Sequence, residues 1–178
     1  LAHHALAAAA SLRAQIVDGD LCHRCGSCVA ICPTNVLAAN DLGYPEVANL
    51  SSCTDCDLCV KVCPGDELSV PSLAKQLFGK VPDIRDMHGH FEKAYLCYAQ
   101  DEQVRKGSTS GGAITGLLIS MLERKEIDGA VVVASDETVP WKGKPILART
   151  KEQLLSTMKS KYAICPTNMM LKEVLETE

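Results

Sequence analysis

The stretch CHRCGSCVAICP, from Cys22 to Pro33, returns about thirty residues later as CTDCDLCVKVCP, from Cys53 to Pro64. Each copy has the pattern C-x-x-C-x-x-C-x-x-x-C followed by proline. The two copies together use eight of the ten cysteines in a chain of 178 residues. Such an internal repeat indicates one compact unit whose two halves carry the same chemistry.

The spacing of these cysteines predicts iron–sulfur ligation. It is the pattern of ferredoxins with two clusters, in which the fourth cysteine of each run binds the cluster of the other run. A disulfide framework and a zinc site are the alternatives, but disulfide scaffolds seldom repeat this spacing, and zinc sites close on two pairs of ligands. We therefore expect two [4Fe-4S] clusters. The first is assigned to Cys22, Cys25, Cys28 and Cys63, and the second to Cys53, Cys56, Cys59 and Cys32.

Other residues near and outside the runs carry weaker predictions. The small Gly26 and Ser27 leave room for a cluster and for backbone N–H groups beside it, and His23 is placed to influence its potential. Cys97 and Cys165 lie outside the runs, and we expect them to be inert, buried strand residues.

Composition limits the class of protein. A formal charge of -4 and a pI of about 5.7 leave no broad basic surface, which argues against nucleic acid as a partner. We find no apolar run long enough to span a membrane. The opening segment lacks the basic start of a secretory signal, and a first residue Leu1 suggests a processed or partial product. A cytoplasmic location in an anaerobe is expected, since such clusters are oxygen-sensitive.

The chain divides into three predicted segments and an α+β fold. Residues 1–20 are a helical lead-in, residues 21–70 a ferredoxin-like domain with two [4Fe-4S] clusters, and residues 71–178 an α/β domain. In the last segment we expect a linker with a short helix, a strand at 93–100, a glycine-rich turn, a helix at 113–127 and a strand at 130–134 that is buried on both faces. A further strand at 145–149 and helices at 151–160 and 168–178 follow.

The first of these elements predict a βαβ unit that crosses over right-handed onto a parallel sheet. The helix at 113–127 is amphipathic, and its apolar residues recur at helical spacing: Ala113, Ile114, Leu117, Leu118, Met121 and Leu122.

The glycine-rich turn GSTSGG, from Gly107 to Gly112, is a candidate phosphate site. It lacks the lysine of a P-loop and is not a G-x-G-x-x-G motif. Its hydroxyls and backbone N–H groups stand at the start of a helix, where a phosphate or pyrophosphate is favoured. A plain capped turn explains the same residues equally well.

The stretch from Arg105 to Val133, together with the double cysteine motif and the tripeptide SKY at 160–162, resembles the beta-subunit family of deazaflavin-reducing hydrogenases. That family includes formate dehydrogenase beta subunits and the flavoprotein subunit of the deazaflavin-oxidising respiratory complex of methanogens. The similarity extends from about Leu21 to Glu178. Family members continue beyond this point, so we expect the second domain to be incomplete at its C-terminus.

The resemblance implies an oxidoreductase in which FAD exchanges a hydride with the deazaflavin coenzyme (factor 420) and passes electrons to the two clusters. It places the FAD pyrophosphate near Gly107, Ser108, Thr109, Ser110, Gly111 and Gly112, and Lys161 near the flavin ring. No catalytic residue is assigned. The implied partners are redox subunits of the hydrogenase, formate dehydrogenase, heterodisulfide reductase or respiratory complex type. Other relatives act on other substrates, a chlorophyll-derivative reductase among them, so the hydride partner stays open.

Two other functions fit the same sequence. A non-enzymatic electron carrier would hold the two clusters and no flavin, with the second domain serving only to dock it in a larger complex. A structural subunit would use the clusters as staples for a small core, although two neighbouring clusters exceed what a staple requires.

Overall fold

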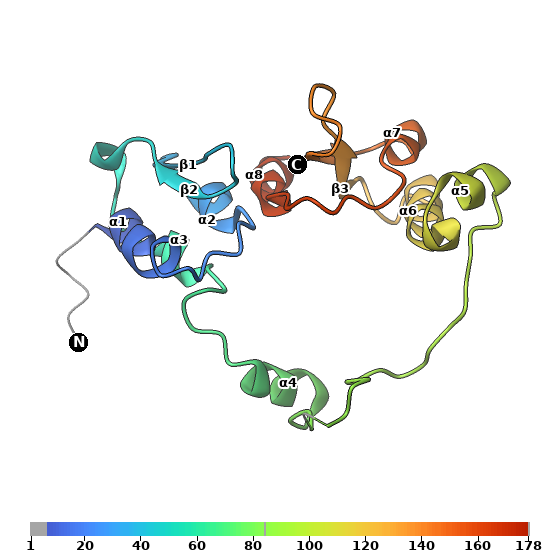
Figure 1. Ribbon diagram of the computed structural model, residues 1–178, viewed down its shortest axis with the longest axis horizontal. Coiled ribbons are helices and arrows are strands. Elements are labelled where there is room, and N and C mark those ends of the chain that lie inside the picture. The colour runs from blue at the N-terminus through green and yellow to red at the C-terminus, as the bar shows by residue number, and fades with distance from the viewer. Residues whose placement is uncertain (1–6, 84, 178) are drawn as a thin grey trace.

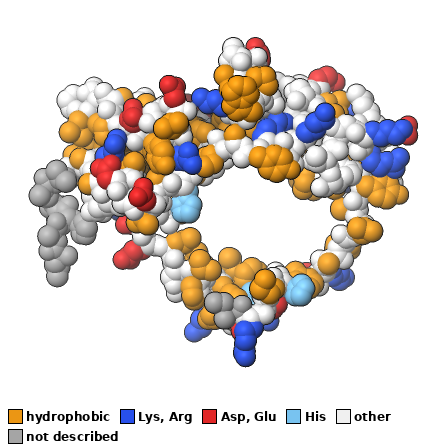
Figure 2. Space-filling model, in the orientation of Figure 1, with side chains coloured by type: hydrophobic (Ala, Val, Ile, Leu, Met, Phe, Trp, Pro, Cys, Tyr) orange, Lys and Arg blue, Asp and Glu red, His pale blue; other side chains and the backbone are white. Residues whose placement is uncertain are grey.

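The computed structural model describes residues 7–83 and 85–177, which form two lobes joined by an extended segment (Figure 1). We call residues 7–66 the N-lobe and residues 99–177 the C-lobe. The segment between them carries helix α4 (Val70–Phe78) and runs around an opening that is visible in the space-filling view (Figure 2). Helix α8, near the end of the chain, returns to lie beside α2 of the N-lobe (Figure 1).

The N-lobe is built from short helices and one small hairpin. Its elements are α1 (Ala8–Leu12), a π-helical turn (Arg13–Val17), α2 (Ser27–Ile31), β1 (Leu37–Ala39), β2 (Pro45–Val47), a 3-10 turn (Leu50–Ser52) and α3 (Leu58–Lys61). Strands β1 and β2 pair antiparallel, with Leu37 opposite Val47.

The two cysteine runs fold in the same way. In each run, the loop after the second cysteine turns through a left-handed residue, Gly26 (φ +86°) in the first and Asp57 (φ +59°) in the second. A short helix starts at the next residue and carries the third cysteine. The repeat predicted from the sequence is therefore a repeat of local structure.

The lead-in segment covers the cysteine runs. A helix forms within the predicted stretch, and its buried residues Ala8, Ala9, Leu12 and Ile16 pack with Cys28, Val36, Leu37 and Cys59 in one core. The backbone N–H of Ala8 donates to Asp55 Oδ1 at 2.7 Å, which ties the lead-in to the second run. Residues 1–6, which also belong to the predicted lead-in, lie outside the described residues.

Truncation of the buried Leu12 tests this cover. We expect Leu12→Ala to lower the free energy of unfolding by about 2–5 kcal/mol, because it opens a cavity in a core with few large side chains. Loss of iron in air should also become faster, because Leu12 lines a cavity together with Cys22, Cys25, Cys28 and Cys63. Denaturant unfolding and the decay of visible absorbance measure the two effects. Leu42→Ala, at a position that is 69% exposed, is the control. Equal effects of the two substitutions would contradict the role of Leu12 in covering the cysteine runs.

The C-lobe has a small hairpin with helices around it. Its elements are α5 (Glu102–Gly107), a 3-10 turn (Ser110–Gly112), α6 (Ala113–Glu123), β3 (Ala130–Ser135), β4 (Gly143–Ala148), α7 (Lys151–Ser156), a 3-10 turn (Thr167–Met170) and α8 (Leu171–Glu176). Its core holds Ala99, Val104, Ile119, Ala130, Ala148 and Leu154. Thr150 and Gln153 form a capping box that begins α7, as a Thr-x-x-Gln sequence favours.

The predicted parallel βαβ unit is wrong. Residues 93–100 form no strand, and β3 pairs antiparallel with β4, with Val131 opposite Leu147. A single strand needs a partner for its backbone groups, and the N–H of Ala99 instead donates to the carbonyl of Gly111 at 2.8 Å. The chain after β3 turns back on itself at Asp136. That carboxylate accepts hydrogen bonds from the Thr138 side chain and from backbone N–H groups of Thr138 and Val139, and these bonds lower its pKa to about 2.

The predicted burial of the C-lobe is also wrong in part. Strand β3 is not buried on both faces, since Val131 is 37% exposed, and on α6 the exposed fraction of Ile114 is 73%. Ile119 is the buried residue of that helix. Cys97 is exposed, Cys165 is half-buried, and neither lies in a strand, so neither is a buried strand cysteine. A sheet of two strands covers less apolar surface than the predicted parallel sheet would.

Other elements were predicted well. Strand β4 overlaps the expected strand at 145–149, and α6 and α7 form within the expected helices. The expected short helix of the linker is α4, which begins at Val70, slightly before the predicted stretch. The helix predicted at 168–178 is a 3-10 turn followed by α8. In the part of the chain that the structure describes, we find no helix with the length and hydropathy needed to cross a bilayer.

Candidate cluster and cofactor sites

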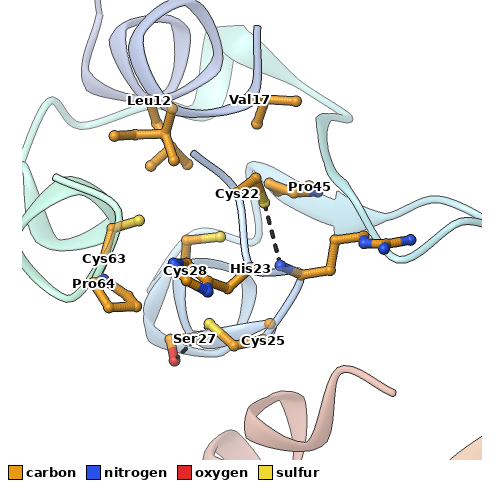
Figure 3. A pocket seen from close by; sticks show the side chains of 13 residues that line it. Leu12, Val17, Cys22, His23, Cys25, Ser27, Cys28, Pro45, Cys63 and Pro64 are labelled. Atoms are coloured by element: carbon orange, nitrogen blue, oxygen red, sulfur yellow. Dashed lines mark hydrogen bonds between the residues drawn. The ribbon is translucent and has the colours of Figure 1, made fainter. Parts of the chain in front are cut away.

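The first predicted set of cysteines lines one cavity. Cys22, Cys25 and Cys28 come from the first run, and Cys63 reaches the same cavity from the second run. Figure 3 shows these side chains around a common space beneath Leu12 and Val17 of the lead-in. The structure thus brings together the four residues that the sequence assigned to one cluster.

The second predicted set lines another cavity. Cys53, Cys56 and Cys59 come from the second run and Cys32 from the first, with Ala8 and Ala9 of α1 as cover. Helices α2 and α3 pack against each other, so the fourth cysteine of each run, just beyond its helix, reaches the cavity of the other run. The exchange of fourth cysteines therefore operates in both directions. Cys56 is the exposed member of the set.

The chemistry of both cavities suits iron–sulfur ligation. All ten cysteines are free thiols. Burial raises the pKa of Cys28 to about 12 and that of Cys59 to about 11. Metal ligation requires thiolates, so binding of a cluster would release these protons. Among residues 7–83 and 85–177, no group of three or more His, Cys, Asp or Glu side chains is arranged to hold a single metal ion. Four cysteine side chains around a common space are the ligand set that a [4Fe-4S] cluster takes.

Backbone N–H groups point at sulfur in both cavities. Arg24 N donates to Cys22 Sγ at 3.4 Å, as drawn in Figure 3, and Val36 N donates to Cys32 Sγ at 3.3 Å. Such bonds stabilise negative charge on a ligand sulfur and so help to set a cluster potential. His23 lines the first cavity, where the sequence placed it.

The residues that cover the cavities were missed by sequence reasoning. Leu12, Ile16 and Val17 line the first cavity, and Ala8 and Ala9 the second. The signal was present, because Ala8, Leu12 and Ile16 recur every four residues and mark one face of a helix.

A larger, open cavity lies in the C-lobe beside the glycine-rich turn. Its volume is about 560 Å³, within the usual range for small-molecule sites. Its walls come from three parts of the chain, which are the turn with the start of α6, strand β3, and the segment after α7. The lining residues include Ser108, Thr109, Ser110, Gly112, Val132, Val133, Thr157, Met158, Ser160 and Lys161.

Two of the predicted glycines, Gly107 and Gly111, pack against neighbouring segments and do not line the cavity. An added Cβ at Gly107 would lie 2.7 Å from Met158 Cε, and one at Gly111 would lie 3.0 Å from Tyr98 Cβ. Neither glycine lines the cavity, so both allow close packing of neighbouring segments. Of the six turn residues predicted to meet a pyrophosphate, four line the cavity.

The turn itself has the features of an anion site. Gly112 precedes α6 with φ +70°, no side chain caps that helix, and its first residues, Ala113, Ile114 and Thr115, line the cavity. A helix of this kind attracts negative charge at its N-terminus. Ser108 Oγ is buried and has no hydrogen-bond partner within the described part of the chain. A buried polar atom without a partner points to a missing ligand or water.

The segment around Lys161 lies against the same turn. Ser160 Oγ and Thr109 Oγ1 are 3.1 Å apart, which joins the SKY tripeptide to the glycine-rich turn. Lys161 Nζ donates to the carbonyls of Thr157 at 2.6 Å and Met158 at 2.9 Å, and to that of Lys159 at 3.2 Å. Burial lowers the pKa of Lys161. The three N–H donors of Lys161 are thus occupied by backbone carbonyls, and its contribution to the cavity is the positive charge of the ammonium group.

Comparison with known proteins finds two family matches along the chain. Residues 14–64 match the 4Fe-4S dicluster domain family. Residues 94–172 match the N-terminal part of the beta subunit of coenzyme F420 hydrogenase/dehydrogenase.

Three curated proteins illustrate the similarity. The chain is 33% identical over 158 residues to the coenzyme F420-dependent sulfite reductase of Methanocaldococcus jannaschii, covering 89% of this chain and 22% of that protein. It is 37% identical over 85 residues to the coenzyme F420 hydrogenase subunit beta of Methanosarcina barkeri, covering 48% and 29%. It is 25% identical over 166 residues to one subunit of the F(420)H(2) dehydrogenase of Methanosarcina mazei, covering 92% and 44%. The chain therefore spans less than half the length of these relatives.

The dicluster match and the paired cysteine cavities define an iron–sulfur protein of the two-cluster ferredoxin type. Residues 94–172 carry the N-terminal domain of the beta-subunit family of coenzyme F420 hydrogenases and dehydrogenases. The resemblance inferred from the sequence is confirmed.

Proposed function

We propose that the chain is an electron-input module, which passes electrons between coenzyme F420 and a partner subunit by way of FAD and two [4Fe-4S] clusters. The observation that carries this proposal is the presence, in one chain, of two cavities with four cysteines each and a third cavity beside the glycine-rich turn. FAD supplies the conversion between a two-electron hydride and the single electrons that iron–sulfur clusters carry.

The residues of the third cavity support FAD as its occupant. The open start of α6 and the unpartnered Ser108 hydroxyl suit a pyrophosphate, while Val132 and Val133 offer an apolar wall. Lys161 adds positive charge, which would stabilise an anionic ring. We assign binding of the cofactor to Ser108, Thr109, Ser110 and Gly112, and give Gly107 and Gly111 a packing role.

The cysteines of the N-lobe have the proposed role of cluster ligands. Cys22, Cys25, Cys28 and Cys63 would hold one cluster, and Cys53, Cys56, Cys59 and Cys32 the other. The lead-in helix packs over both cavities. Cys56 is exposed at the second cavity, which makes that side accessible to a partner.

The substrate and partners follow from the relatives. Their names link them to coenzyme F420 and to hydrogenase, dehydrogenase or sulfite reductase activity. We therefore propose F420 as the hydride partner and a redox subunit or domain of one of these complexes as the electron partner. Eight cysteines that serve as cluster ligands must stay reduced, which favours a reducing compartment such as the cytoplasm.

Anaerobic purification followed by quantification of flavin and iron tests the proposal. We expect about one flavin and about eight irons per chain, the content of two cubanes, with bleaching of the flavin on addition of reduced coenzyme F420. About eight irons without flavin, even after reconstitution with FAD, would contradict the flavin role and leave a ferredoxin-type carrier. Flavin that reduced F420 cannot bleach would contradict the choice of hydride partner.

A further inference from the structure

The two lobes meet at the first cysteine run. The 3-10 turn Thr167–Met170 packs against α2, and the backbone N–H of Asn168 donates to the carbonyl of Cys25 at 3.0 Å. Gly26 permits this approach, since an added Cβ there would lie 2.5 Å from Met169 Cγ. The same C-terminal segment touches the hairpin of the C-lobe, because an added Cβ at Gly143 would lie 3.1 Å from Cys165 Cβ.

A side-chain contact continues from this junction to a cysteine sulfur. Asn168 Nδ2 donates to Ser27 Oγ at 2.8 Å, and Ser27 is buried. Ser27 Oγ in turn lies 3.4 Å from Cys25 Sγ, whose thiol donates to it. Figure 3 shows the Ser27 hydroxyl beside the Cys25 sulfur at the edge of the first cavity.

The direction of this contact reverses when Cys25 is a ligand. A ligated thiolate has no proton to donate and accepts hydrogen bonds instead. The Asn168 amide already donates to Ser27 Oγ, so the hydroxyl proton of Ser27 is free to point at Cys25 Sγ. A hydrogen bond to a ligand sulfur favours the reduced, more negative cluster and raises its potential.

We propose that Asn168 is a positioning residue through which the C-lobe sets the potential of the cluster at Cys22, Cys25, Cys28 and Cys63. Asn168 holds Ser27 as a hydrogen-bond donor to the Cys25 sulfur. The inference rests on the proposed role of these cysteines as ligands, but not on the binding of flavin. The contacts from Asn168 through Ser27 lead to Cys25 of the first cavity, so the inference concerns the potential of the first cluster and not that of the second.

The chain contains a natural control for this position. The hexapeptide AICPTN occurs twice, at residues 30–35 and 163–168, so Asn35 and Asn168 follow the same five residues. Asn35 is exposed, and its Oδ1 accepts a hydrogen bond from Lys172 Nζ. An Asn→Asp change at either site introduces the same charge. Asp tolerates the positive φ of Asn35 (+53°), so the control does not strain the backbone.

Redox titrations monitored by electron paramagnetic resonance test the proposal on the reconstituted chain. Cys22→Ser, which alters the signal of the first cluster, identifies the midpoint potential that belongs to it. We expect Asn168→Ala to lower that potential and leave the other unchanged. Asn168→Asp should lower it further, because a carboxylate accepts the Ser27 proton and turns the hydroxyl away from Cys25. Asn35→Asp should leave the potential of the first cluster unchanged.

A second variant distinguishes a change in the potential of the first cluster from a general effect on folding. Ser27→Ala should lower the same potential, and the double variant Ser27→Ala/Asn168→Ala should show no further fall, because both changes act through one hydroxyl. Unchanged potential in Asn168→Asp and Ser27→Ala, or an equal shift of both clusters, would overturn the proposal. Flavin content measured on the same samples reports on the proposed function separately, since the expected shifts do not require flavin.

Discussion

Double substitutions of cysteine should remove either one cluster or both, depending on which run each residue comes from. We expect Cys25→Ala/Cys63→Ala to leave about four irons per chain, because both residues line the first cavity. Cys25→Ala/Cys32→Ala should leave almost none, because those two residues line different cavities although they belong to the same run. Iron and sulfide analysis after anaerobic reconstitution measures the difference.

The matched control is the pair outside the runs. Cys97→Ala/Cys165→Ala removes two thiols and should retain about eight irons, since neither residue lines either cysteine cavity. If each run instead held its own cluster, the two test variants would exchange results. That reversal would contradict the crossed assignment of ligands.

The second large effect is expected at Gly112, where the turn meets α6. An alanine there would place its Cβ 2.8 Å from the carbonyl oxygen of Val104, at a φ of +70° that costs a non-glycine residue about 1–2 kcal/mol. Relief of this clash must move the turn and the first N–H groups of α6. We therefore expect the dissociation constant for FAD to rise by more than about tenfold, since tenfold corresponds to about 1.4 kcal/mol.

Gly79→Ala separates backbone strain from damage to the cavity. Gly79 has a similar φ of +73°, but an added Cβ would have no neighbour within 4 Å, and the residue lies in the connecting segment. The Gly79→Ala protein should retain its flavin, although its free energy of unfolding should fall by a similar amount, because alanine is strained at this left-handed φ. Titration with FAD and circular dichroism of both variants provide the measurement. A folded Gly112→Ala protein that binds FAD as tightly as the parent would contradict the pyrophosphate site.

The cysteine assignments were accessible from sequence because ligand spacing is a local property. Three cysteines at intervals of three must share one loop, and the fourth, after a further turn, must leave it. The structure places all eight in the expected two cavities. The lead-in that covers them was predicted as a helix, but its packing over Cys28 and Cys59 required the fold.

The errors in the C-lobe have a different origin. Strand pairing depends on which segments meet, and a β-favouring run such as residues 93–100 stays unpaired when no neighbour is present. The reversal at Asp136 rests on three hydrogen bonds to one carboxylate. Periodicity of apolar residues does not report such a turn, and so it could not distinguish an antiparallel hairpin from a parallel crossover.

The repeated hexapeptide AICPTN adopts different local structures in its two copies, so its role depends on the tertiary structure. In the first copy Ile31 ends helix α2 and Cys32 lines a cysteine cavity. In the second, Ile164 lies in irregular backbone and Asn168 in a 3-10 turn that bonds to Ser27. The sequence by itself determined the two sets of cysteines and the glycine-rich turn, because each is a matter of spacing along the chain. Only the tertiary structure decided which lobe touches which cavity, because identical residues take their roles from the surfaces packed against them.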